Sequence, residues 1–116
     1  MLETHTASFL KLIDSVLEDT ARGVVSRHHL HNVRCGIENI VALFEYNDEL
    51  VQKADQLSRR ACDYITYCDL VTSKISEGTI GEDDNRLRIA REALAGFRLA
   101  VEQCQPNSRV RTLGLA

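Results

Sequence analysis

Apolar residues recur along this chain at spacings of three and four, which is the period of an α-helix and not the alternation of a β-strand. The pattern predicts helices at about residues 7–22, 26–46, 49–76 and 84–105. The single proline, Pro106, follows the last segment, where it interrupts no helix. We therefore expect an all-α fold, either an antiparallel helical hairpin or a four-helix bundle, which dimerisation could complete.

The residues expected to face the core share this helical spacing. They are Leu10, Ile13, Leu17 and Thr20, then Leu30, Val33, Ile37, Ile40 and Phe44, then Leu50, Ala54, Leu57, Ala61, Tyr64, Cys68, Val71 and Ile75, and finally Leu87, Ala90, Leu94, Phe97, Val101 and Cys104. The third set is close to a seven-residue repeat, which requires a facing helix. Asn47 and Asp48 form a short connection, which favours antiparallel packing of the second and third helices. The apolar faces of the last two helices exceed what one hairpin buries, so a homodimer is also expected.

Glycines divide the pattern. Gly23 either weakens the junction between the first two helices or ends the first one, and the sequence leaves both alternatives open. Gly36 and Gly96 fall inside predicted helices, where we expect close helix crossings. Residues 77–84 combine glycines with acids and predict a loop before the fourth helix, and residues 109–113 could extend as a strand.

Composition and charge narrow the class of protein. The 116 residues fit a single domain, 1–116, whose 44 % hydrophobic and 27 % charged residues are typical of soluble globular proteins. The 14 basic residues are scattered among 17 acidic ones, so we expect no nucleic-acid partner. The apolar runs are short and the N-terminus lacks the pattern of a signal peptide, so we expect no membrane contact and a cytoplasmic location.

The cysteines form no recognisable motif. Cys35, Cys62, Cys68 and Cys104 include no CxxC pair, which argues against a zinc ribbon or a thioredoxin-type site. We expect thiols, three of them small core residues and Cys35 on a polar face. No glycine-rich nucleotide loop occurs, and we expect no cofactor.

The segment RHHLHNVRCGIENI, residues 27–40, concentrates reactive side chains. At about 100° per residue, four of them fall within an arc of roughly 80° on the side away from the apolar residues. These four, the histidine face, are His28, His31, Cys35 and Glu38. His29 lies between the polar and apolar sides. One interpretation of the face is a solvated helical surface with no chemistry.

A second interpretation is a metal site, because His28, His31, Cys35 and Glu38 are all of ligand types. Their spacings of three and four could bring two or three of them to one ion. All four extend over more than about 10 Å of one helix, so a complete site would need residues from another helix or a second subunit.

A third interpretation is phosphotransfer. A neutral, accessible imidazole on a rigid helix can attack an acyl phosphate on the aspartate of a partner protein. Asn32 lies one helical turn after His28 on the same face, where its amide could bond the ring or position a water.

Residues 27–40 resemble the phosphoacceptor helix of histidine kinase dimerisation domains and of two-helix histidine phosphotransferases, whose pattern is histidine, acid, apolar, variable, then asparagine or threonine. The resemblance covers about residues 8–76. It implies that His28 is the phosphoacceptor, that Asn32 assists, that the hairpin dimerises into a four-helix bundle, and that the partner is a response-regulator receiver domain. His29 stands where the kinases have an acid, and we expect no ATP-binding domain, so the resemblance implies a relay or a degenerate regulatory homologue.

The rival class is a non-catalytic helical adaptor or export chaperone that binds the helix of a partner protein. The two classes need different surfaces. Phosphotransfer needs an exposed His28 with a docking surface around it. An adaptor needs a large apolar groove and is indifferent to the substitution His28→Ala.

Overall fold

The computed structural model describes residues 2–74 and 85–106. It contains four helices, α1 (Leu2–Ala21), α2 (Arg27–Ala42), α3 (Asp48–Lys74) and α4 (Asn85–Glu102). In this part of the chain the only β pairing is an isolated bridge between Phe44 and Pro106. The predicted all-α fold is confirmed, while the loop predicted at 77–84 and the strand at 109–113 lie outside the described residues.

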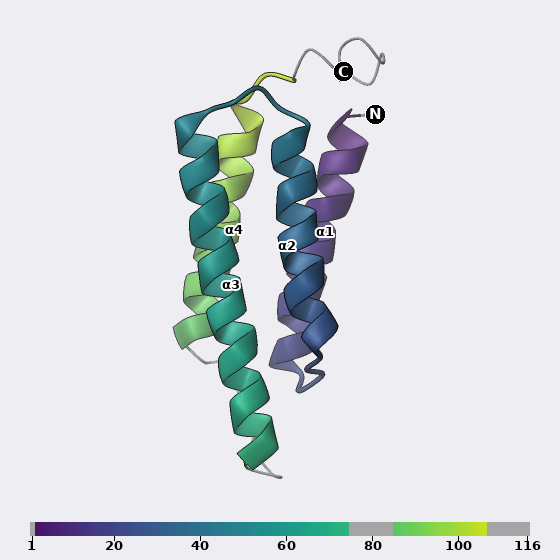
Figure 1. Cartoon of the computed structure of the whole chain (residues 1–116), viewed down its shortest axis with the longest axis vertical. Helices are drawn as coiled ribbons and strands as arrows, with labels where there is room; N and C mark the ends of the chain where they lie inside the picture. The colour runs from purple at the N-terminus through teal and green to yellow at the C-terminus, as the bar shows by residue number, and fades with distance from the viewer. Residues whose placement is uncertain (1, 75–84, 107–116) are drawn as a thin grey trace.

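The four helices alternate in direction and close into one bundle (Figure 1). α1 packs most extensively on α2, and α3 packs most extensively on α4. Contacts between α2 and α3, and between α1 and α4, complete the ring. The resemblance to kinase dimerisation domains implied a bundle built from two chains. Here a single chain supplies four helices, because α1 and α4 pack on the hairpin that α2 and α3 form.

Most of the core consists of positions that the helical spacing predicted, and four apolar residues outside the prediction are buried with them, Val16, Ala21, Ile65 and Ala100. The predicted positions that are buried are Leu10, Ile13, Leu17, Thr20, Val33, Ile37, Ile40, Phe44, Leu50, Ala54, Leu57, Ala61, Tyr64, Cys68, Leu87, Ala90, Leu94, Phe97 and Val101. Leu30 and Cys104 are half-buried, and the side chains of Val71 and Ile75 lie outside the described set. The apolar faces of α3 and α4 are therefore covered within one chain. A homodimer stays a prediction that these residues do not support.

Gly23 ends α1, which decides the alternative that the sequence left open. Its φ of 91° lies in the left-handed region, where a side chain would be strained. The amide of Gly23 bonds the carbonyl of Thr20 at 3.1 Å, and the amide of Val24 bonds the carbonyl of Asp19 at 2.9 Å. This pair of bonds is a Schellman motif, which satisfies carbonyls at the end of a helix. α1 and α2 are consequently separate helices.

The two helices predicted to end at 46 and 105 end earlier, because the segments after them bond to each other. The amide of Glu45 donates to the carbonyl of Gln105 at 2.8 Å, beside the bridge between Phe44 and Pro106. Backbone groups used in this way cannot continue a helical ladder. We call this pairing of residues 44–45 with 105–106 the clasp. It fixes the end of the bundle where α2 and α4 finish.

The two glycines inside helices differ in their surroundings. A Cβ added to Gly36 would lie 3.4 Å from Cγ1 of Ile13, so α1 and α2 cross closely there, as expected. A Cβ added to Gly96 would meet only Cδ of Lys53, at 3.8 Å. The expectation of a close crossing at Gly96 is therefore wrong, since an alanine fits without any shift.

The outer surface carries short-range charge pairs. Arg59 bonds Asp55 at 2.6 Å, and Arg88 bonds Glu92 at 2.8 Å, each one turn apart on an exposed helix face. Such exposed pairs add little stability. Across the described ranges, 2–74 and 85–106, no helix has the length and apolar character needed to cross a membrane. A cytoplasmic location stays a prediction.

We predict opposite effects for alanine at two glycines. Gly23→Ala places a Cβ at a left-handed residue and should lower the free energy of unfolding by about 1 kcal/mol. Gly96→Ala, its control, has room for the Cβ and should raise it by roughly 0.5–1 kcal/mol through helix propensity. Urea unfolding followed by circular dichroism measures both. Destabilisation by Gly96→Ala would contradict the packing described here.

Candidate functional site

His28 lies in the first turn of α2 and is exposed. The helix begins here because Ser26, in an extended conformation, accepts a hydrogen bond from the amide of His28 at 3.2 Å. Amides in the first turn of a helix point toward its N-terminus and favour negative charge. A negatively charged group attached to the His28 ring would therefore lie at the electrostatically favourable end of α2.

Asn32 lies one turn after His28, as the sequence predicted, and is half-buried. Within residues 2–74 and 85–106, no hydrogen bond joins its amide to the His28 ring. The structure therefore places the two predicted catalytic residues on one face without fixing them against each other.

His29 is held differently. Its Nδ1 lies 3.4 Å from Oγ1 of Thr20, across the junction between α1 and α2. The Thr20 hydroxyl has one proton, which it donates to the carbonyl of Val16 at 2.8 Å. Thr20 can therefore only accept from His29, and the proton of the neutral ring belongs on Nδ1. The lone pair then lies on Nε2. Sequence reasoning placed His29 between the two sides of α2, and it is half-buried there.

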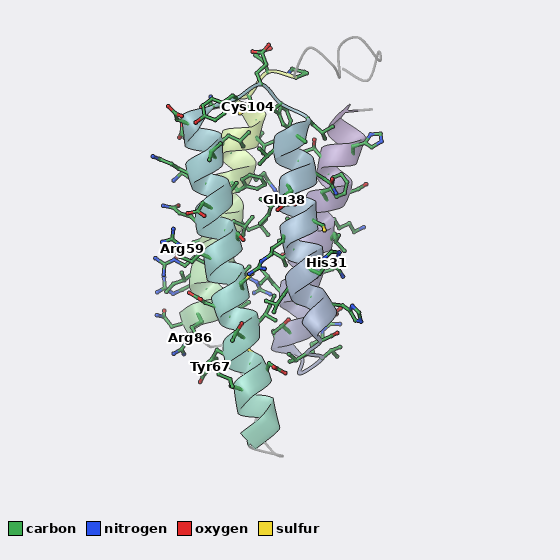
Figure 2. All side chains as sticks on the ribbon, in the orientation of Figure 1. His31, Glu38, Arg59, Tyr67, Arg86 and Cys104 are labelled. Carbon is green, nitrogen blue, oxygen red and sulfur yellow. The ribbon has the colours of Figure 1, made fainter. Side chains whose placement is uncertain are left out.

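His31 pairs with Cys35, one turn along α2. The Sγ atom lies 3.4 Å from Nε2 and 3.8 Å from Nδ1 of His31. Glu38 is two turns beyond His31 on the same helix, and Figure 2 shows the two side chains apart. Of the side chains that the structure describes, no three from His, Cys, Asp and Glu lie close enough to hold a metal ion. The four ligands of the metal interpretation are therefore not brought together.

A second candidate site, the α1/α4 cleft, lies between the first and last helices and has a volume of about 670 Å³. It is lined by Thr6, Ala7, Leu10, Lys11 and Asp14 of α1, by Arg98, Val101 and Glu102 of α4, and by Phe44, Cys104 and Pro106 near the clasp. Six of these eleven side chains are apolar or are a thiol, and the floor of the cleft is therefore mainly apolar.

Thr6 is the buried polar group of the cleft. It exposes only 7 % of its surface, and its hydroxyl has no hydrogen-bond partner among the described residues. Thr20, in the same helix, instead bonds the carbonyl of Val16. A buried hydroxyl without a partner costs about 1–3 kcal/mol. The oxygen itself is buried, so a ligand would supply the missing bond only after the neighbouring side chains shift.

Charges of both signs surround the cleft. α1 contributes Lys11 and Asp14, and α4 contributes Arg98 and Glu102, all exposed. As far as the structure describes the chain, none of the four forms an ion pair within 4 Å. Both walls therefore offer charges that are available to a ligand.

Cys104 lies at the clasp end of the cleft, where α4 finishes (Figure 2). Its thiol donates to the carbonyl of Ala100 at 3.1 Å. Burial raises the pKa of this thiol, and the carboxylate of Glu49 raises it further. Cys104 is thus a protonated thiol at neutral pH and a poor nucleophile. The expectation of three core cysteines holds fully only for Cys68, because Cys62 and Cys104 are half-buried.

Neither a protein-family model, nor a curated protein, nor a solved structure matches this chain. The resemblance to histidine phosphotransfer proteins therefore stays a hypothesis that residues 27–40 alone carry. Function is inferred from the two sites described above.

Sequence reasoning missed the α1/α4 cleft for a physical reason. The first helix was predicted to begin at residue 7, which left Thr6 outside it. The cleft also depends on which helices become neighbours, and periodicity assigns a face to each helix without naming its partner. The one available signal was a polar Thr6 in line with the apolar Leu10 and Ile13.

We predict that the neutral His29 ring carries its proton on Nδ1. Long-range proton–nitrogen NMR spectra report the tautomer of each histidine directly. Thr20→Val removes the acceptor, so His29 should shift toward the Nε2–H form, while His28 should not change. An Nε2–H tautomer of His29 in the unmodified protein would contradict the contact with Thr20.

Proposed function

We propose that this chain is a non-catalytic helical-bundle module that binds another protein through the α1/α4 cleft. The supporting observation is the cleft itself, whose apolar floor contains a buried hydroxyl without a partner. Its volume of about 670 Å³ leaves room for side chains of a partner protein to enter.

The contrast between the two sites favours binding over catalysis. The three imidazoles of α2 have three different surroundings: His28 is exposed, His29 contacts Thr20, and His31 contacts Cys35. Acid–base and nucleophilic catalysis usually pair a reacting group with a second group directed at the same atom, and among the described residues no hydrogen bond joins two of these rings. The cleft, in contrast, gathers apolar, polar and charged groups from α1, α4 and the clasp around one volume.

Histidine phosphotransfer is a second candidate function, and the position of His28 favours it. The ring is exposed in the first turn of α2, where a phosphoryl group would be favoured, and Asn32 follows one turn later. In this proposal His28 accepts phosphate from the aspartate of a receiver domain, and its Nε2 or Nδ1 becomes the phosphorylated atom while the aspartate carboxylate leaves.

A displayed random-peptide library, selected on the immobilised protein, tests the binding function. We predict binders that are lost on Ala7→Trp, because the indole fills the cleft from an exposed position without changing the core. Ala95→Trp is the matched control, since Ala95 is also exposed and helical but does not line the cleft. Failure to select any peptide, or binders that ignore Ala7→Trp, would contradict a binding role for the cleft.

Incubation with phosphorylated receiver domains tests the second candidate. If His28 is the acceptor, acid-labile phosphate should appear on the protein and disappear in His28→Ala. His31→Ala, which changes another exposed imidazole of the same helix, should retain the label. Labelling that survives His28→Ala would exclude His28 as the acceptor, and no labelling from any donor would exclude the relay.

A further inference from the structure

We propose that the occupant of the α1/α4 cleft is an amphipathic helix of a partner protein, with one apolar stripe and a defined order of charges on each side of it. This inference rests on the binding function proposed above and specifies the partner of that site. Three features of the cleft support this partner: its length, the order of charges along its walls and the Thr6 hydroxyl.

The length of the cleft matches two turns of a helix. Its α1 wall runs from Thr6 to Asp14, which at 1.5 Å per residue is about 12 Å. A helix that docks through residues i, i+3 or i+4, and i+7 presents anchors over about 10.5 Å. A helix lying along α1 and α4 would therefore span the cleft with one set of such anchors.

The charges along the two walls run in opposite orders. α1 and α4 are antiparallel (Figure 1). From the clasp end, the α1 wall presents Lys11 and then Asp14, and the α4 wall presents Glu102 and then Arg98. Each wall thus presents one charge of each sign, and the order of the signs along the cleft is opposite on the two walls.

A bound helix would complement this order with four charges of its own. On the side next to α1 it needs an acid near Lys11 and a base near Asp14, three to four residues apart. On the side next to α4 it needs a base near Glu102 and an acid near Arg98. Reversing the direction of the helix exchanges the two sides and reproduces the same charge pattern, so the charges alone do not fix the direction of the helix.

The Thr6 hydroxyl adds a requirement at the clasp end. The outermost anchor there should carry a hydrogen-bonding side chain, such as glutamine, because an apolar anchor would leave Thr6 unpaired. A fully apolar anchor such as leucine serves as the comparison. A glutamine anchor combines apolar contact with a donor and an acceptor.

Two designed helical peptides test the proposal, one with the charge order above and one with all four charges inverted. Both keep the same apolar stripe and glutamine anchor. By calorimetry on the full chain, the first should bind about tenfold more tightly, because four exposed charge pairs change sign together. Ala7→Trp should abolish binding, and Ala95→Trp should leave it unchanged. Lys11→Glu should weaken the first peptide and be rescued by a lysine at the facing peptide position.

The Thr6 contact has its own readout. Thr6→Val, which is close in shape, should weaken the glutamine-anchored peptide about fivefold. A leucine-anchored peptide should bind the variant at least as well as the unmodified protein. Equal loss for both peptides would show that the substitution disturbs the fold and not the bond, and it would overturn this contact.

Cys104 reports occupancy independently. Bound peptide should slow its alkylation at alkaline pH, measured by mass spectrometry, while Cys62 outside the cleft serves as the internal reference. Equal affinity for the two peptides, or unchanged alkylation of Cys104, would overturn the proposal.

Other occupants give different results. If residues 107–116 of the same chain fill the cleft, Cys104 is protected without peptide and neither peptide binds. A second copy would produce concentration-dependent sedimentation that Ala7→Trp abolishes. Each of these results would overturn the partner-helix proposal. Selected library peptides that depend on Ala7 but contain proline throughout cannot be helical. They would overturn the helical occupant and still support the binding function of the cleft.

Discussion

The structure depends on one constraint, which is that each helix must bury one apolar face against its neighbours. One residue from each helix illustrates this burial. No part of Ile13, Ile40, Leu57 or Phe97 is exposed to solvent. This burial is the main favourable contribution to folding in a small helical protein. It leaves the opposite faces free of packing requirements. The histidine face of α2 occupies such a free surface, so its residues are not needed for the bundle to form.

The fold was predictable because the helical spacing of apolar residues is enough to identify the core positions. The buried face of α1 was predicted from the spacing of Leu10, Ile13 and Leu17, and the structure buries all three. The helix ends were less predictable, since α2 stops at Ala42 for a reason that lies at Gln105. A bond between residues sixty positions apart leaves no local signal. The same limit hid the tautomer of His29, because its partner Thr20 belongs to another helix.

The two candidate sites differ in how the fold produces them. The residues of the histidine face follow from the sequence of one helix and need only that helix to be regular. The α1/α4 cleft is a product of tertiary structure, with walls from both ends of the chain. A buried hydroxyl without a hydrogen-bond partner is uncommon in proteins, which gives the cleft more weight than the histidine face, where His28 and His31 are exposed. Binding modules built on helical bundles use grooves of this kind.

The clasp makes the cleft dependent on the whole chain. Phe44 and Pro106 both line it, and they are held together by the pairing of Glu45 with Gln105. Fraying of the last turn of α4 would separate these segments and remove one end of the cleft. Occupancy and folding are therefore thermodynamically linked, and a bound partner would raise the melting temperature in proportion to the logarithm of its concentration. The stability of this end of the bundle would then report whether the cleft is filled.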